Sequence, residues 1–252
     1  MNFLSSYSHK KMKIKHQLIC IILFSGIIVA KGLPGNWATY WQESMQTIIS
    51  DQTNQWILST AALAALAATQ VDMQVTHYAQ TKGLLSDPVS HFGDKYGAEW
   101  GHWILWSSIL VTSAMNNDSK DDIISKMQFS SFALITNRII TVGMKRIVGR
   151  IRPNGNCCKS FPSGHTSHSF TIAAIARELY GDEIGALAYS IATLVAFSRI
   201  NDNKHYLSDV LFGAALGTAV GRGFALNYRK FASEASDSGI TPQLQLKFTI
   251  PL

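Results

Sequence analysis

Residues 129–152, FSSFALITNRIITVGMKRIVGRIR, decide how the rest of the chain is interpreted. The apolar residues of this stretch recur at three- and four-residue spacing: Phe129, Phe132, Ile135, Ile139, Val142 and Ile147. Such spacing is typical of an α-helix with one buried face. The polar and aromatic stretch 36–50 predicts an amphipathic helix. Further helical stretches are predicted over 56–68, 103–115, 166–180, 184–197 and 206–226. Because no strand-turn-strand pattern interrupts them, we predict an all-α helical bundle.

The composition limits the classes of partner. Apolar residues make up 47% of the 252 residues and charged residues 15%, against roughly 25% charged in an average soluble domain. Burial of a large fraction or contact with a membrane surface is therefore expected. The net charge is +6, but Lys10, Lys11, Lys13 and Lys15 supply four of these charges and leave +2 over the rest of the chain. A nucleic-acid partner is not expected.

Residues 1–30 have the pattern of a signal peptide or an N-terminal anchor. A basic stretch over 10–16 precedes the apolar stretch 18–30, and Gly32, Pro34 and Gly35 then break any helix. Thirteen residues are too few for a membrane span but fit the apolar core of a secretory signal. We expect export to the periplasm, or to the periplasmic face of a bacterial inner membrane.

The remaining chain divides into N-terminal helices over 31–125, a catalytic core over 126–228 and a tail over 229–252. Near the end Leu244, Leu246, Phe248 and Ile250 alternate with polar residues, as in a strand. Such a segment either pairs with another molecule or forms a loosely held tail, and we favour the tail.

Two observations bear on membrane insertion and leave it open. The apolar runs of the body are 11 to 15 residues long, shorter than the roughly 20 that cross a bilayer. Residues 53–71, however, carry no charge. Gly213, Gly217 and Gly221 lie four apart, so another helix can approach their face closely, as in membrane helices and in tightly packed soluble ones.

The first cluster of candidate site residues is Lys145 with Arg152-Pro153. Seven residues are close to two helical turns, so both side chains would project from one helix face. Pro153 would end the element at Arg152. A guanidinium can bind two phosphate oxygens at once, whereas an ammonium acts as a point charge. A solvated basic helix end, including Arg146 and Arg150, is the alternative interpretation.

The second cluster is Pro162-Ser163-Gly164-His165, directly before a predicted helix. Backbone N–H groups at a helix N-terminus bind anions, and Gly164 lets the backbone come close. Ser163 can cap the helix or donate to phosphate. His165 would act as a proton donor, although surface or core positions are more common for a loop histidine.

The third cluster is Ser198-Arg199 followed by His205 and Asp209. Four residues apart, His205 and Asp209 would share one helix face, so that Asp209 accepts from one ring nitrogen and leaves the other as a nucleophile. Capping residues at 201–203 would place His205 in the first turn. A capped helix with an ordinary His–Asp pair is the alternative.

Together the three clusters resemble the signature of the type 2 phosphatidic acid phosphatase and vanadium haloperoxidase superfamily. Residues 210–217, VLFGAALG, resemble its lipid-directed branch. The resemblance implies hydrolysis without a metal or other cofactor, in which His205 attacks phosphorus, Asp209 orients it and His165 protonates the leaving oxygen. The residues implied to hold the phosphate oxygens are Lys145, Arg152, Ser163, Gly164 and Arg199.

We therefore expect a phosphatase acting on a phosphate monoester or diphosphate, and we favour one carried by a lipid. A soluble periplasmic acid phosphatase of broad specificity is the first alternative, and a vanadium-dependent haloperoxidase the second. Cys157 and Cys158 are adjacent and can form a vicinal disulfide, bridge to another chain or stay reduced; no metal-type spacing accompanies them.

Overall fold

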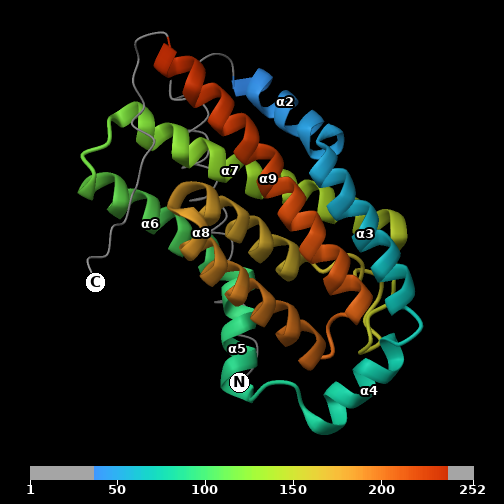
Figure 1. Ribbon diagram of the computed structural model, residues 1–252. Coiled ribbons are helices and arrows are strands. Elements are labelled where there is room, and N and C mark those ends of the chain that lie inside the picture. The colour runs from blue at the N-terminus through green and yellow to red at the C-terminus, as the bar shows by residue number, and fades with distance from the viewer. Residues whose placement is uncertain (1–36, 238–252) are drawn as a thin grey trace, which may run out of the picture.

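The computed structural model describes residues 37–237, so the segment 1–30 and the strand-like segment 244–250 lie outside the described residues. Within 37–237 the regular elements are helices (Figure 1). They are α2 (Trp37–Ser50), α3 (Gln52–Ala68), α4 (Asp72–Lys82), α5 (Asp87–Lys95), a π-helical turn (Tyr96–Trp100), α6 (Gly101–Met115), α7 (Lys120–Val148), α8 (Gly164–Asn201) and α9 (Leu207–Asp237). The all-α prediction is confirmed. Helix α9 extends beyond the predicted end at 226, because buried residues such as Phe231 continue its packed face.

Helix α8 doubles back on itself at Gly181. This residue has φ 86°, a backbone conformation that glycine adopts without a steric penalty. The two arms are joined by a small buried cluster of Ala173, Ala176, Ala188 and Ala192. The helices predicted over 166–180 and 184–197 are thus the two arms of one hairpin, and both ends of α8 lie at the same end of the bundle.

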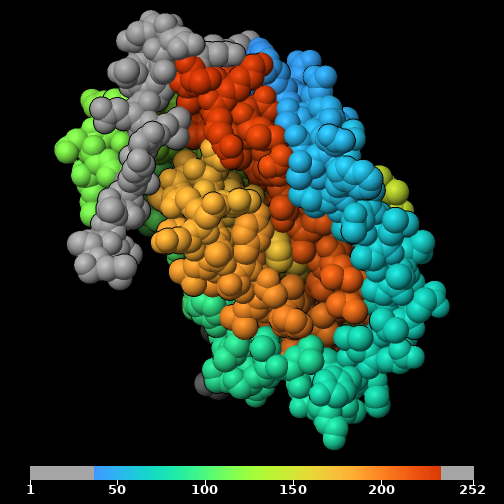
Figure 2. Space-filling view, viewed as in Figure 1, coloured from blue at the N-terminus to red at the C-terminus, as the bar shows by residue number. Residues whose placement is uncertain are grey.

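Helix α9 lies between the α8 hairpin and the pair α2–α3, as Figure 2 shows. Its three spaced glycines face α8. A β-carbon on Gly213 would lie 2.8 Å from the carbonyl oxygen of Ser163, and one on Gly217 would overlap the carbonyl oxygen of Ser167. The predicted close approach of a second helix backbone is confirmed.

The apolar core joins α2, α7 and α9 and is rich in aromatic rings. Tyr40 is fully buried, and its hydroxyl donates to the carbonyl of Phe224 over 3.1 Å. Phe129 stacks on Tyr228, with ring centroids 4.7 Å apart. This core fixes α7 and α9 side by side.

The apolar stripe predicted on α7 is only partly buried. Phe129 and Phe132 lie in the core, but Ile139 is 59% and Ile147 86% exposed. The inward face of the second half of α7 is polar instead, with buried Thr136, Asn137 and Thr141. Two of these side chains have polar partners inside the bundle: Thr136 accepts from the Trp41 indole and Asn137 from the Ser167 hydroxyl. Ile139 and Ile147 face outward, whereas Ile140 and Met144 pack against the core.

By length and composition, two helices among the described residues can cross a membrane, namely α8 and the part of α9 over Leu207–Ser233. A third span is possible if the bent pair α3 and α4 counts as one. Large apolar side chains lie exposed on several helices, including Leu63, Leu66, Leu110, Val111 and Leu187. The short apolar runs seen in the sequence underestimated these lengths, because small and polar residues continue each helix beyond them.

Replacing Gly217 with alanine should destabilise the fold, because the added methyl group meets the backbone of α8. We expect a loss of about 1–3 kcal/mol in the free energy of unfolding, as for other overpacked interiors. Gly143→Ala is the matched control: a β-carbon there meets nothing within 4 Å, so the change should be neutral or stabilising by up to ~1 kcal/mol. Thermal unfolding in detergent measures both, and equal midpoints for the two variants would contradict this packing.

Candidate active site

The three clusters of candidate residues meet at one end of the bundle. The C-terminal end of α7, the loop 149–163, both ends of α8 and the start of α9 all lie there. The backbone N–H of Ser163 donates to the carbonyl of Asp209 over 3.0 Å, and that of His205 to the carbonyl of Arg199 over 3.2 Å. Backbone hydrogen bonds therefore hold the second and third clusters together.

The expectation that Lys145 and Arg152 share a helix face was wrong. Helix α7 ends at Val148, and Gly149 follows with φ 60° in the left-handed conformation that commonly terminates helices. Arg152 lies beyond this point in the loop, where its N–H donates to the carbonyl of Asn156 over 3.0 Å. Gly149 ends the helix before Pro153 can do so.

Lys145 projects from the last turn of α7 against the loop. Its ammonium donates to the carbonyls of Lys159 at 2.6 Å and Pro162 at 2.5 Å. Its Cε lies 3.6 Å from where a β-carbon on Gly164 would stand. Burial, together with the nearby Arg152 charge, lowers the pKa of Lys145 to about 8.

Two guanidinium groups accompany Lys145, and each keeps a buried N–H without a hydrogen-bond partner among residues 37–237: Nε of Arg152 and Nε of Arg199. Arg199 is nearly buried and binds Asp94 of α5, with Asp202 3.5 Å away. Asp94 also lies 3.5 Å from Nε2 of His165. Buried donors are nearly always paired in folded proteins, so these two N–H groups are candidates for binding oxygen atoms of a ligand.

Ser163 and Gly164 form the N-terminus of α8. Ser163 is the N-cap residue, but its side chain makes no capping bond to the backbone; it pairs with the Thr166 hydroxyl over 2.9 Å instead. The first N–H groups of a helix lack intrahelical partners and favour an anion. His165 follows in the first turn and lines a cavity of about 810 Å³ together with Gly164.

His205 and Asp209 do not lie on one helix as expected. Helix α8 continues to Asn201, a turn follows, and α9 begins only at Leu207, so His205 precedes the helix and Asp209 lies in its first turn. The imidazole is 2% exposed, and its Nδ1 lies 3.6 Å from an oxygen of Asp209. This is a close approach, longer than a normal hydrogen bond. Burial lowers the pKa of His205 to about 4 although Asp209 opposes the shift, so the ring is neutral at pH 7.

The carboxylate of Asp209 is the best-connected group of the site. It accepts from the guanidinium of Arg150 at 2.7 Å, from the hydroxyl of Ser160 and from the backbone N–H of Tyr206 at 2.9 Å. The hydrogen bond from the N–H of Tyr206 fixes the carboxylate at the start of α9, beside His205.

Arg150, interpreted from the sequence as part of a solvated helix end, instead joins three elements. Besides Asp209 it donates to Ser208 at 2.6 Å and to Asp72 of α4 at 2.7 Å, and it covers the ring of Tyr206 at 4.2 Å. Asp72 in turn accepts from Ser208. Asp72, Asp94 and Ser160 were also missed, because no local spacing connects them to the motifs.

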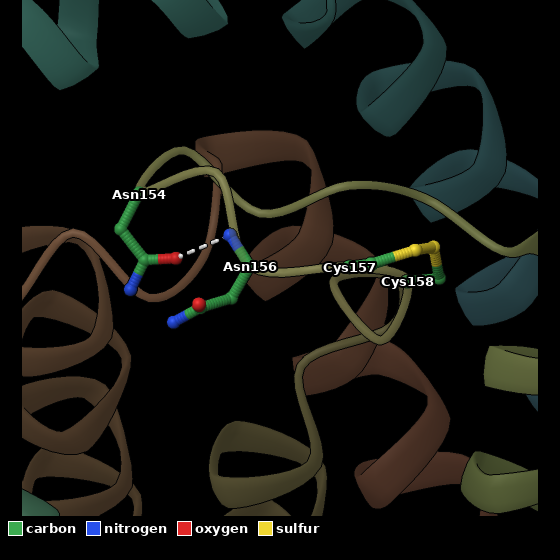
Figure 3. The surroundings of a disulfide bond; sticks show 4 residues. All are labelled: Asn154, Asn156, Cys157 and Cys158. Carbon is green, nitrogen blue, oxygen red and sulfur yellow. Dashed lines mark hydrogen bonds between the residues drawn. A yellow bond between two sulfur atoms is a disulfide. The ribbon is translucent and has the colours of Figure 1, made fainter.

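Cys157 and Cys158 form a disulfide in the loop that contains Arg152 (Figure 3). Beside them the side chain of Asn154 accepts from the backbone N–H of Asn156 over 3.1 Å. Of the three states that adjacent cysteines allow, the structure has the vicinal bond.

Taken together, the ends of the helical bundle carry buried, neutral His205 beside Asp209 and, at the same end, the three cations Lys145, Arg152 and Arg199. The sequence model of the PAP2 superfamily matches residues 129–232. This match contains all three clusters and confirms the resemblance drawn from them.

Two curated relatives match part of the chain. One is a lipid A 1-phosphatase of Porphyromonas gingivalis, 42% identical over 76 residues, which are 29% of this chain and 17% of that protein. The other is lipid phosphate phosphatase 1 of Arabidopsis thaliana, 31% identical over 142 residues, covering 40% of this chain and 42% of that protein. The chain thus spans less than half the length of either relative.

Two solved structures are similar. LpxE of Aquifex aeolicus has a TM-score of 0.48 at 19% identity and covers 60% of this chain and 92% of its own. A transmembrane PAP2-type phosphatidylglycerolphosphate phosphatase of Bacillus subtilis has a TM-score of 0.44 at 20% identity and covers 82% and 98%.

The lowered pKa of Lys145 predicts how anion binding depends on pH. Tungstate stays dianionic over this range, so its dissociation constant should rise above about pH 8, where Lys145 loses its charge. Lys145→Arg keeps the charge and should hold the affinity to higher pH. Isothermal titration between pH 6 and 10 measures both, with Lys82→Arg as a control on exposed α4. If the dissociation constant of Lys145→Arg rises at alkaline pH as it does in the unchanged protein, Lys145 has no role in anion binding.

Proposed function

We propose that this protein is a phosphatase that hydrolyses the phosphate monoesters or diphosphates of lipids through a phosphohistidine intermediate. The observation that carries this proposal is the position of neutral, buried His205 beside Asp209 at the same helix ends as Lys145, Arg152 and Arg199. An anion held by those cations lies within the reach of an uncharged nucleophile.

The first step is an attack on phosphorus by Nε2 of His205. Because Nδ1 faces Asp209, Nε2 is the nitrogen whose lone pair is free. The N–P bond forms as the bond from phosphorus to the leaving oxygen breaks, and His165 gives that oxygen a proton. Negative charge spreads over the equatorial oxygens, where Lys145, Arg152, Arg199, Ser163 and the Gly164 N–H bind them.

The second step returns the enzyme to its starting state. Water attacks the phosphohistidine, His165 takes up the proton that the water loses, and the N–P bond breaks to release inorganic phosphate. No residue in this sequence of steps requires a metal ion, and we expect turnover to persist in EDTA. Asp209 keeps the imidazole oriented through both steps.

A lipid substrate is supported by the helices that can cross a membrane and by the names of the two relatives, which are lipid phosphatases. The exposed apolar residues of the bundle favour this substrate over the small esters of a soluble acid phosphatase. With residues 1–30 serving as an export signal or anchor, the site would act at the periplasmic face of the inner membrane.

His205→Ala should abolish phosphate release, because the variant has no nucleophile; we expect a loss of at least about a thousandfold. Purified protein would be assayed with phosphatidic acid, a polyprenyl diphosphate and a chromogenic monoester in EDTA. Lys82→Ala, on the exposed end of α4, should retain full activity. Rapid alkaline quench and mass spectrometry should find a phosphoryl adduct on His205, and its absence with activity retained in His205→Ala would overturn the mechanism.

Arg150 should be a positioning residue for Asp209. Arg150→Lys keeps the positive charge but cannot contact Asp209, Ser208 and Asp72 together, so Asp209 and hence His205 lose their fixed orientation. We expect kcat to fall about tenfold or more, with a much smaller change in KM. Arg146→Lys, exposed one turn earlier, is the matched control. A change confined to KM would assign Arg150 to substrate binding instead.

A further inference from the structure

The cavity that reaches Gly164 and His165 extends far beyond the phosphate site. It has a volume of about 810 Å³ and runs between α6 on one side and α7 and α8 on the other. Its lining is mainly apolar and includes Trp103, Leu110, Met127, Leu134 and Ile135. A cavity of this size and lining fits a hydrocarbon chain attached to the reacting phosphate.

Four buried polar atoms without a hydrogen-bond partner among the described residues belong to residues that line this cavity. They are Nε1 of Trp106, Nδ1 of His102 and the hydroxyls of Ser131 and Thr141. Buried polar groups are nearly always paired in folded proteins, so four exceptions around one cavity require an explanation. The indole N–H can only donate. A ligand that satisfies it must therefore present an acceptor.

These atoms lie at several depths from the phosphate site. Thr141 is nearest, since its methyl group lies 3.5 Å from where a β-carbon on Gly164 would stand. Ser131 is ten residues earlier on α7, which corresponds to about 15 Å along the helix axis. A single oxygen atom near the phosphate cannot reach all of them. The ligand must carry acceptors at more than one position along its length.

The charges on the walls favour neutral acceptors over a second phosphate. Arg138 is the one guanidinium on the lining, and Lys145 does not line the cavity. Burial lowers the pKa of His102, so its ring is neutral at pH 7. His102 packs edge-on against Trp106, with ring centroids 5.3 Å apart, so two neutral polar side chains lie next to each other on the lining.

We propose that this cavity binds the acyl part of the substrate and that Trp106, Ser131, Thr141 and His102 recognise its ester or amide carbonyl oxygens. The inference rests on the proposed function and narrows its substrate to acyl lipid phosphates. An isoprenoid chain fills the apolar space but offers no acceptor, so it leaves these polar groups buried and unpaired. Leaving a buried polar group unpaired costs binding free energy, so a site of this kind rejects a ligand of similar shape that lacks the acceptor.

The test compares a lipid phosphate that has ester carbonyl groups with two that lack them. Full-length protein in detergent micelles would be given diacyl phosphatidic acid, its dialkyl ether analogue and a polyprenyl phosphate of similar length. We expect kcat/KM for the diacyl lipid to exceed that for the other two by at least about tenfold, which corresponds to losing one or two hydrogen bonds.

Two variants that each remove one polar group assign the preference to the cavity. Trp106→Phe removes the indole N–H and Thr141→Val the hydroxyl, while both keep most of the apolar surface. Each should lower kcat/KM for the diacyl lipid about three- to tenfold and leave kcat/KM for the ether analogue unchanged. The ratio of the diacyl value to the ether value therefore falls. Trp100→Phe, at an exposed indole outside the cavity, should leave that ratio as it is.

The outcomes separate this inference from the proposed function. Equal turnover of diacyl and dialkyl lipids, or a ratio unaffected by Trp106→Phe and Thr141→Val, overturns the acyl site while the phosphatase remains. A preference for a lipid bearing a second phosphate, abolished by Arg138→Gln, overturns it as well. No phosphate release from any lipid or from a chromogenic monoester would instead reject the proposed function itself.

Discussion

The buried carboxylate of Asp209 is the group on which the arrangement of this site depends. A carboxylate without solvent contact is stable only when its charge is balanced and its oxygens are hydrogen-bonded. Arg150 supplies the charge, while Ser160 and the N–H of Tyr206 supply further donors. These partners come from the loop after α7 and from the start of α9. Satisfying one carboxylate therefore fixes the elements that carry the proposed phosphate-binding groups and the proposed nucleophile.

The cations around the site likewise need negative charge to balance them. Lys145, Arg152 and Arg199 repel one another, and without a ligand Arg199 is held by Asp94. Asp94 is also the carboxylate nearest to His165. An anion that enters must therefore share Arg199 with Asp94 or displace it. Phosphate binding and the surroundings of the proton donor are coupled through this one aspartate on α5.

Much of the fold followed from the sequence because its signals are local. Apolar spacing located most helices, and the glycines at 213, 217 and 221 indicated the face of α9 that contacts α8. The end of α7 was predicted at Arg152, because proline commonly follows a helix end. In the structure α7 ends earlier, where Gly149 adopts the left-handed conformation. His205 was placed on a helix because its spacing to Asp209 fits one, although the same spacing also fits a turn followed by an N-terminal helical turn.

The candidate residues were found as motifs, but their supporting partners were not. Arg150 lies between two motif positions and has the composition of a solvated helix end, yet it pairs with Asp72, which is 78 residues away in the sequence. Asp94 meets Arg199 across 105 residues. Neither pairing has a spacing rule, because tertiary packing creates it. The unpaired polar atoms of the large cavity are likewise visible only once α6 and α7 are placed together.

The reversal of α8 at Gly181 has a consequence for how this protein would sit in a bilayer. The arm from Gly164 to Tyr180 has seventeen residues, a length of about 26 Å, and the hydrocarbon layer of a membrane is about 30 Å thick. An upright hairpin would thus put its bend near one leaflet and its two open ends, with His165 and Arg199, near the other. Lengthening both arms equally would then adapt the protein to a thicker bilayer without altering the chemistry at the open ends.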